Sequence, residues 1–200
     1  MKLFILGATG RTGRLLLQQA LDRGHEVVAF VKDGSSLQAT ANVRVVAGDV
    51  RNANELAGAL PGADAVVSAL GIRSKADGML LRDSASTMLV ALRSSGVRRY
   101  LVVSQGLLFP SRNPIIALLR GFFAAAVADS TAMEEVVRAS DVAWTIARPP
   151  RLTDGSSRGY RALAGARPRG ACSMNRAGLA AFLLDEAERA QYPKTIVGLG

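Results

Sequence analysis

The sequence has little of the residue types that build metal centres and redox sites. Among its 200 residues there is one cysteine, Cys172, and one histidine, His25. A single cysteine cannot form an internal disulfide, and these two residues are too few for a typical zinc site. We therefore expect no metal site, and any redox chemistry must come from a bound cofactor.

Long apolar runs are missing as well. The longest apolar tract, Ile115 to Ala128, is interrupted by Arg120 and is shorter than the roughly 20 residues that a bilayer-spanning helix needs. The N-terminus enters an apolar run directly after Lys2, without the pattern of a secretory signal. We expect a cytoplasmic protein with no membrane partner. The tract is interpreted as a buried helix, the alternatives being a dimer face or an apolar wall beside a cofactor.

Acidic residues are outnumbered by basic ones. The chain has 25 lysines and arginines but 16 aspartates and glutamates, which gives a net charge of +9. Such a total describes solubility and non-specific attraction rather than fold. Only four of the cations are lysines, and most arginines stand singly along the chain, which is typical of a solvated surface. We therefore expect no specific binding of nucleic acid.

Six near-continuous apolar runs alternate with segments of helical spacing. The runs are 2–6, 26–30, 43–47, 64–70, 99–104 and 142–147, and the helical segments are 14–23, 54–60, 80–94, about 114–140 and 176–189. Near-continuous apolar runs are typical of parallel strands covered on both faces. The pattern predicts an α/β fold over residues 1–200: a single domain with a Rossmann-like, doubly wound parallel sheet and helices on both faces. Ligands of such sheets bind at the carboxyl ends of the strands.

The stretch GATGRTG, residues 7–13, stands between the first apolar run and the first helical segment. Glycine permits a tight turn and a close approach of the backbone to a diphosphate, and the following helix offers unpaired N–H groups to the anion. Gly7, Gly10 and Gly13 therefore predict a dinucleotide cradle, with the hydroxyls of Thr9 and Thr12 as further donors. The alternative is a glycine turn used only for packing.

The end of the second run, FVKDGSS, bears on the choice of cofactor. A cation there suits the 2′-phosphate of NADP, whereas an acid favours the free ribose of NAD. Lys32 comes first, Ser35 and Ser36 follow, and Arg11 is within reach from the glycine stretch. Asp33 is the counter-argument, because its carboxylate would favour NAD if it pointed inward. We expect NADP(H) to be favoured over NAD(H).

Later strand ends continue the same arrangement. AGDV at 47–50 offers Asp49 to the adenine amino group and Val50 to the ring, and SALGIR at 68–73 has small residues beside which a cofactor can pass. VVSQG places Ser104 at the nicotinamide end, either as a catalytic hydroxyl or as one bonded to the backbone. His25 precedes the second strand, at the opposite edge, so it cannot pair with Ser104 and is interpreted as a surface turn residue.

These stretches, with DAVVSALGIR, SGVRRYLVVS and the ARPP at 147–150, resemble the atypical short-chain dehydrogenase/reductase family. The resemblance is closest to its NAD(P)H-binding, NmrA-like branch that contains biliverdin-IXβ reductase, also a flavin reductase. It covers most of the chain. It implies that Gly7, Thr9, Gly10, Arg11, Thr12 and Gly13 hold the diphosphate, Lys32 the 2′-phosphate, Asp49 and Val50 the adenine, Leu70, Gly71 and Arg73 the central part, and Ser104 the nicotinamide side, with Pro149 and Pro150 closing over the nicotinamide.

The sequence departs from the family pattern in two ways. None of Tyr100, Tyr160 and Tyr192 has a lysine four residues later, so the usual Y-x-x-x-K pair is missing. Arg151 also stands where the biliverdin-reductase-like pattern has histidine. The resemblance then implies hydride transfer without a strong protein acid, which suits flavins and quinones because their reduced forms take protons from water.

The segment from Pro149 to Arg169 is rich in glycine, proline, serine and arginine, and it is predicted to form loops over one edge of the sheet. We treat about 149–175 as a substrate-side segment. Seven arginines and a single acid, Asp154, lie between Arg148 and Arg176. They either attract carboxylates or phosphates of a substrate or form a solvated basic loop.

Together the sequence predicts a monomeric or homodimeric NADPH-dependent oxidoreductase acting on a small planar conjugated acceptor, which can be anionic. The alternative is a non-catalytic NAD(P)-sensing regulatory protein, which would explain the missing acid without any substrate.

Overall fold

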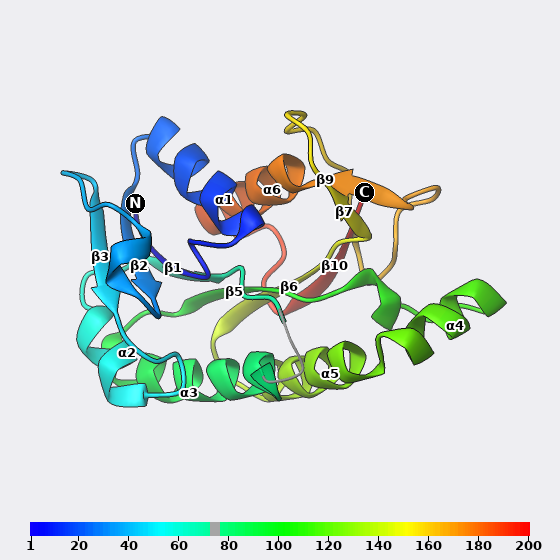
Figure 1. The fold of residues 1–200 in the computed structure, drawn as a ribbon, viewed down its shortest axis with the longest axis horizontal. Coiled ribbons are helices and arrows are strands. Elements are labelled where there is room, and N and C mark those ends of the chain that lie inside the picture. The colour runs from blue at the N-terminus through cyan, green and yellow to red at the C-terminus, as the bar shows by residue number, and fades with distance from the viewer. Residues whose placement is uncertain (73–76) are drawn as a thin grey trace.

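An eight-stranded sheet organises the molecule, a computed structural model that describes residues 1–72 and 77–200 (Figure 1). The strand order is β3-β2-β1-β4-β5-β6-β10-β8, and every strand is parallel to its neighbours except β8, which pairs antiparallel with β10. The order reverses between β1 and β4, where ligands of open α/β sheets bind. The strands are β1 (Lys2–Leu6), β2 (Glu26–Val31), β3 (Val43–Ala47), β4 (Ala65–Ser68), β5 (Arg99–Val103), β6 (Ala143–Arg148), β8 (Ala162–Ala164) and β10 (Thr195–Leu199).

The predicted fold class is confirmed, because the six apolar runs form β1 to β6 side by side and in parallel. Two parts of the prediction are wrong. The segment 149–169 contains β7 (Arg151–Thr153) and β8 in addition to loops, and β7 pairs with β9 (Ser173–Asn175) in a small second sheet. Strand β10 was not expected. It is short, and what makes it a strand is its pairing with β6 and β8.

Helices cover both faces of the sheet (Figure 1). Helices α1 (Arg11–Asp22) and α6 (Arg176–Arg189) pack on one face, over a core that includes Leu16, Leu179 and Phe182. Helices α2 (Ala53–Ala59), α3 (Leu80–Ser95) and α5 (Ala124–Arg138) pack on the other, over a core that includes Phe4 and Met88. Because the central strands lie between these two cores, they are apolar on both sides, as their sequences indicate.

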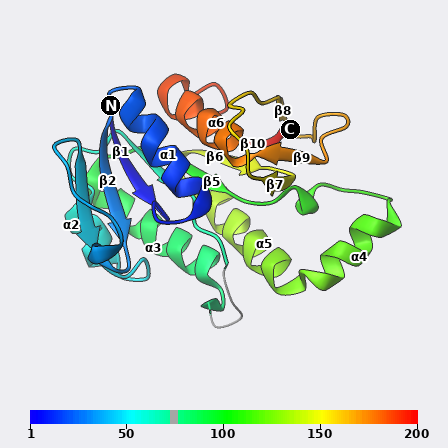
Figure 2. The ribbon, with the colours of Figure 1, turned by 45° about the horizontal axis from the view of Figure 1, so that its top comes forward.

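The apolar tract after Pro114 is not one buried helix, so that expectation is wrong. It divides into α4 (Pro114–Phe122) and α5, which meet at a bend of 90°. No residue of α4 is buried, and the exposed fractions of Leu118 and Phe122 are 74% and 81%. Helix α4 extends outward at the end of the molecule opposite α2 (Figure 2). Within the described ranges no single helix is long and apolar enough to cross a membrane, and only the bent pair of α4 and α5 qualifies by length and composition.

His25 is also placed differently from the expectation of a surface turn residue. Its side chain is buried at the amino end of β2, where its Nε2 lies 2.7 Å from Oε1 of Glu188 in α6. Arg23 donates to the same carboxylate at 3.0 Å. These contacts hold α1 and β2 against α6, so His25 has a structural role. It lies at the amino ends of the strands, away from the carboxyl ends where ligands bind.

Candidate functional site

A cleft of about 940 Å³ opens along the carboxyl ends of the central strands. Its lining residues come from the glycine turn, from the ends of β2 to β5, and from α3, α5, β7 and α6. They are Gly7, Asp77, Leu80, Leu81, Ala126, Ser130, Leu152, Arg176 and the segments 9–12, 30–32, 48–51, 69–72 and 103–105. Most of the predicted site residues are therefore gathered in one place.

The glycine turn has the shape that the sequence predicts. Gly7 has a φ of 80°, and a Cβ there would lie 2.8 Å from the carbonyl oxygen of Ala69, so this position requires glycine. Gly13 is not among the residues that line the cleft, and its expected contact with a diphosphate stays a prediction. A Cβ on Gly13 would overlap the carbonyl oxygen of Gly7, so its role is to let α1 pack against the turn.

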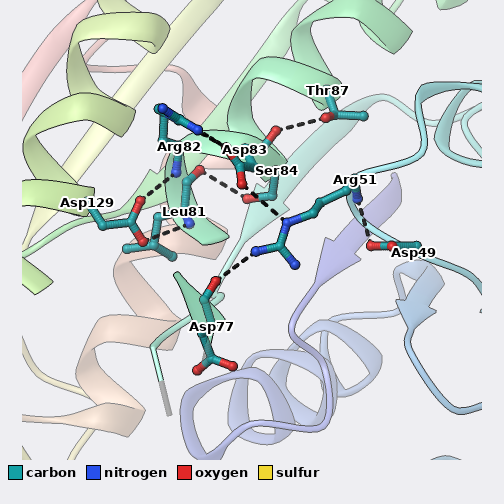
Figure 3. A network of polar contacts seen from close by, with 9 residues as sticks. All are labelled: Asp49, Arg51, Asp77, Leu81, Arg82, Asp83, Ser84, Thr87 and Asp129. Atoms are coloured by element: carbon teal, nitrogen blue, oxygen red, sulfur yellow. Dashed lines mark hydrogen bonds and ion pairs between the residues drawn. The ribbon is translucent and has the colours of Figure 1, made fainter. Parts of the chain in front are cut away.

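The start of α1 is open toward the cleft. Its N-cap residue, Gly10, provides no side-chain hydrogen bond, and Thr9, Arg11 and Thr12 line the cleft around it. The start of α3 also borders the cleft, but it is closed: the carboxylate of Asp129 in α5 accepts from the backbone nitrogens of Leu81 and Arg82 at 3.0 and 2.9 Å (Figure 3). Of these two helix ends, the start of α1 is the one whose backbone N–H groups are open to an anion.

At the end of β2 the structure separates Lys32 from Asp33. Lys32 lines the cleft, whereas Asp33 does not. The Asp33 carboxylate accepts from the backbone nitrogen and the hydroxyl of Ser35 at 2.9 and 2.8 Å, and these bonds hold its pKa below the usual range. Ser36 bonds the carbonyl of Asp33 in the same turn. The two serines therefore stabilise the turn, and Lys32 is the charged side chain that this turn presents to the cleft.

The end of β3 brings a residue that the sequence prediction missed. Asp49 and Val50 line the cleft as expected, and Asp49 accepts from the backbone nitrogen of Arg51 at 2.9 Å. The Arg51 side chain also lines the cleft, where it donates to Asp83 at 3.2 Å and to the carbonyl of Asp77 at 2.7 Å (Figure 3). Hydrogen bonds from Arg82 first, and then from Arg51, lower the pKa of Asp83. The available signal was a cation directly after the GDV stretch that follows the third strand.

The central part of the cleft is bordered by Leu70 and Gly71, as the sequence predicts. The third residue expected there, Arg73, lies outside the described residues.

Ser104 lies at the far end of the cleft in a buried polar chain. Its hydroxyl donates to Oε1 of Glu134 at 2.5 Å, and the Glu134 carboxylate is paired with Arg148 through contacts of 2.8 and 2.5 Å. Arg148 in turn lies 4.8 Å over the ring of Phe109. The hydroxyl hydrogen of Ser104 is therefore given to Glu134 rather than to the backbone, which leaves the oxygen able to accept a hydrogen bond. Because Glu134 stands 30 residues away in the chain, the sequence carried no signal of this bond.

The wall beside Ser104 is held by amide and backbone hydrogen bonds. Gln105 donates to the carbonyl of Ala126 and to the hydroxyl of Ser130 in α5, at 2.8 and 2.9 Å. Pro149 is not among the residues that line the cleft, and its expected closure over the nicotinamide stays a prediction. It is buried, and its carbonyl accepts from the backbone nitrogen of Gly106 at 2.7 Å, which supports the 104–106 segment from behind.

The arginines between 148 and 176 are largely engaged. The bonded members are Arg148 with Glu134, Arg158 with Asp22, Arg176 with Asp154, and Arg161 with the carbonyl of Arg169.

Of these bonded arginines, Arg176 is the one that lines the cleft. It does so from the start of α6, with its side chain 10% exposed and its guanidinium 2.6 Å from Asp154. Asp154 also pairs with Arg11, at 3.7 Å. The side chains of Asp154 and Arg11 are both more than 70% exposed, so this pair contributes little to stability.

Other chemistries find no support in the described part of the chain. It holds no group of three or more histidine, cysteine, aspartate and glutamate side chains placed to bind a metal ion. Cys172 is a free, exposed thiol that lies outside the cleft lining.

Comparison with known proteins identifies the family of this chain. A family model described as NAD(P)H-binding matches residues 7–190. An uncharacterized chloroplastic protein of Arabidopsis thaliana is 31% identical over 166 residues, which cover 76% of this chain and 59% of that protein. The photosystem II assembly factor Ycf39 of Synechocystis is 28% identical over 113 residues, covering 52% of this chain and 33% of that protein. The chain thus spans less than two thirds of the length of these relatives.

Solved structures share the fold over the whole chain. The anaerobillin reductase ChuY from Escherichia coli O157:H7 superposes with a TM-score of 0.82 at 22% identity, covering 100% of this chain and 96% of that one. A short-chain dehydrogenase/reductase from Veillonella parvula in complex with NADP gives 0.81 at 21% identity, covering 100% and 94%. With the family model matched over residues 7–190, the chain belongs to the NAD(P)H-binding family, and it shares the Rossmann fold of these solved structures.

Proposed function

We propose that the protein is an NADPH-dependent reductase that transfers hydride to a planar conjugated acceptor such as a flavin or a quinone. The observation that carries the proposal is the far end of the cleft, where Ser104 commits its hydrogen to Glu134 and so acts as an acceptor. Around it lie Gln105, Ala126 and Ser130, and the described cleft lining contains no tyrosine or histidine. Flavins and quinones suit such a site because protons reach their reduced forms from water.

The residues of the cleft fit a bound dinucleotide. The open start of α1 and the turn at Gly7 suit the diphosphate, because N–H groups and the helix dipole both favour an anion there. Lys32 suits the 2′-phosphate, and Asp49 and Val50 suit the adenine. The reduced nicotinamide, when bound, supplies the hydride.

At the acceptor end, the residues of this chain position groups rather than exchange protons. The Ser104 oxygen, with its lone pairs free, accepts a hydrogen bond from the carboxamide of the nicotinamide or from the acceptor. Leu152 of β7 and Ala126 of α5 add apolar surface that excludes water from the same end.

The experiment measures NADPH oxidation, as loss of its near-ultraviolet absorbance, with the purified protein and a panel of flavins and quinones. We expect turnover above the rate without protein for at least one acceptor. No turnover with any of them, in protein that still binds NADPH by calorimetry, would reject the reductase.

A non-catalytic NAD(P)-sensing protein is the second candidate. It is favoured by α4, whose exposed Ile115, Leu118 and Phe122 offer an apolar surface to a protein partner. A sensor would bind NADP(H) without turnover, and its partner would associate only in the presence of the cofactor. The same calorimetry and absorbance measurements therefore separate the two functions.

A further inference from the structure

Helix α4 presents a continuous apolar stripe to the outside of the protein. The stripe consists of the exposed side chains of Ile115, Leu118, Leu119 and Phe122, and Phe123, directly after the helix, extends it. Positions i, i+3, i+4 and i+7 lie on one face of a helix, so the first four side chains share a face. Exposed apolar side chains gathered in this way mark a surface that binds a partner or a membrane.

The polar groups of α4 are used to hold the helix in place. Arg120, the one charged residue of α4, donates to the carbonyls of Leu107 and Phe109 at 2.8 and 2.6 Å. At the start of the helix the side chain of Asn113 accepts from the backbone nitrogen two residues on, at 2.9 Å. The helix is therefore capped and anchored, and its apolar stripe is already formed in the free protein.

Helix α4 is too short to cross a bilayer, so the stripe suits the surface of one. Its 9 residues, at about 1.5 Å per residue, are roughly half as long as the hydrocarbon core is thick. Helix α5, the other member of the bent pair, does not add to this length, because Asp129, Met133 and Val137 bury it in the protein. A short apolar helix at the edge of a folded protein instead enters the boundary between lipid headgroups and acyl chains.

Arginines without partners lie beside the stripe. Arg112 stands two residues before α4, and Arg167, in the loop after β8, lines the same cavity of about 300 Å³ as Ile116 of α4. Arg169 follows in that loop, which lies at the same end of the molecule as α4 in Figure 1. The three arginines are exposed and, within the part of the chain that the structure describes, have no ion-pair or side-chain hydrogen-bond partner.

Carboxylates that could neutralise these arginines are missing from the surrounding sequence or engaged elsewhere. The chain has no aspartate or glutamate in residues 105–128 or 155–184. Directly after the first stretch, Asp129 accepts from the backbone nitrogens at the start of α3. Directly before the second, Asp154 is bonded to Arg176 at 2.6 Å. This end of the protein is therefore positively charged, and the surface complementary to it is anionic.

The charge also distinguishes between possible occupants of the stripe. A second copy of the chain, packed symmetrically stripe against stripe, would bring the arginines of both copies together, which is repulsive. A groove in another protein would have to match arginines that stand on two separate loops. Anionic lipid headgroups need no such matching because they move freely in the plane of the bilayer, and the acyl chains beneath them accept Leu118 and Phe122.

We propose that α4 and the arginines beside it form a docking surface for an anionic lipid bilayer. The apolar stripe enters the boundary of the acyl chains, and Arg112 and Arg167 contact headgroup phosphates. The inference is independent of the proposed reductase function, because none of the described residues that line the cleft belongs to α4. It differs from the expectation, drawn from the sequence, of no membrane partner.

Co-sedimentation with lipid vesicles tests the apolar stripe. We expect the wild-type protein to sediment with phosphatidylcholine vesicles that contain phosphatidylglycerol, and to stay largely in the supernatant with phosphatidylcholine alone or in high salt. Phe122→Ser should weaken this binding roughly tenfold or more, because the burial of an aromatic side chain is lost. Val90→Ser, which removes an exposed apolar residue of α3, is the matched control and should bind as the wild type does.

The same assay tests the arginines. Arg112→Ala and Arg167→Ala should each weaken the binding roughly fivefold, the effect of one basic residue at an anionic surface. Arg93→Ala removes an exposed arginine from the C-terminal half of α3, which lies toward α2 in Figure 1, and should have a much smaller effect because salt screens distant charges. Equal weakening by all three substitutions would show attraction by net charge alone and would overturn the docking surface.

Two further measurements separate this surface from the proposed function and from a dimer. Thermal unfolding confirms that each variant is folded, and calorimetry should give every variant the wild-type affinity for NADPH, whether or not the protein is a reductase. Protein that sediments with none of the vesicles would overturn the lipid surface and leave the stripe to a protein partner. A dimer in sedimentation velocity that Phe122→Ser converts to monomer, without vesicle binding, would assign the stripe to a second copy and overturn the proposal as well.

Discussion

The two ends of the cleft differ in how far apart in the chain their polar partners stand. At the cofactor end, Asp33 bonds to Ser35 and Asp49 to the backbone of Arg51, each two residues away. At the acceptor end, Ser104 bonds to Glu134 across 30 residues, and Arg148 reaches Glu134 across 14. The turns that carry Asp33 and Asp49 are therefore held locally, although Arg51 beside them reaches Asp83 across 32 residues. The acceptor end, in contrast, exists only once α5 and β6 have assembled. Substitutions at the acceptor end should thus cost stability, and side-chain substitutions at the cofactor end should mainly cost affinity.

The largest effect is expected at Glu134. Glu134→Ala removes the partner of both Ser104 and Arg148 and leaves a charged side chain only 12% exposed without its carboxylate. Breaking one half of such a buried pair costs about 3–5 kcal/mol of unfolding free energy, measurable in urea. The adjacent Glu135 is exposed, so Glu135→Ala should stay within about 0.5 kcal/mol. Equal effects of the two substitutions would contradict the structural role of the buried pair.

Gly13 also lies at the cofactor end, but there close packing against Gly7, and not a local hydrogen bond, determines which residue fits. Gly13→Ala places a methyl group on the Gly7 carbonyl, so it should cost about 1–3 kcal/mol in unfolding free energy and shift the turn enough to weaken NADPH binding. Gly58 of α2 has open space around its Cβ position. Gly58→Ala should therefore stabilise the protein by up to about 1 kcal/mol, through helix propensity. A neutral Gly13→Ala would show that the turn tolerates a side chain there.

A substitution of Lys32 should change the affinity for the cofactor without changing the stability of the fold. Lys32→Ala is expected to weaken NADPH binding roughly 10- to 100-fold in calorimetry, because a charge-assisted contact to the 2′-phosphate is lost. NADH, which lacks that phosphate, should bind as before, and the urea midpoint should not move. Asp33→Asn keeps the turn cap and should leave NADH binding unchanged. A loss of NADH affinity in that variant would assign the ribose to Asp33 instead.

The smallest effect is expected at the contacts between α1 and α6, which belong to neither end. Burial raises the pKa of Glu188, but hydrogen bonds from His25 and Arg23 outweigh it and hold the pKa below the ordinary value of 4.5. The unfolded chain therefore takes up this proton first as the pH falls. The stability that Glu188 contributes is complete above pH 4.5 and is lost as the pH falls through the lower folded-state pKa.

Glu188→Gln should remove that pH dependence and lower the unfolding free energy at neutral pH by less than about 1 kcal/mol, with unchanged NADPH affinity. Urea unfolding at neutral and acidic pH measures both quantities. If the unfolding free energy of the variant fell with acid as steeply as that of the wild type, Glu188 would not be the source of the pH dependence.

The six parallel strands and the glycine turn could be predicted from the sequence, and so could the positions of Lys32, Asp49 and Val50 along the cleft. These features are readable because they are local: strands buried on both faces are apolar throughout, and a turn needs particular residues at fixed spacing.

The contacts at the acceptor end could be seen only in the tertiary structure. It gave Ser104 a carboxylate partner, gave Pro149 and Gly13 packing contacts with Gly106 and Gly7, and placed Arg51 and Arg176 on the cleft wall. It also exposed α4, and it paired Arg148, Arg158 and Arg176 with acids. The physical reason is that each of these outcomes depends on which distant elements the sheet brings together, and a contact across 30 residues leaves no periodic trace in the chain.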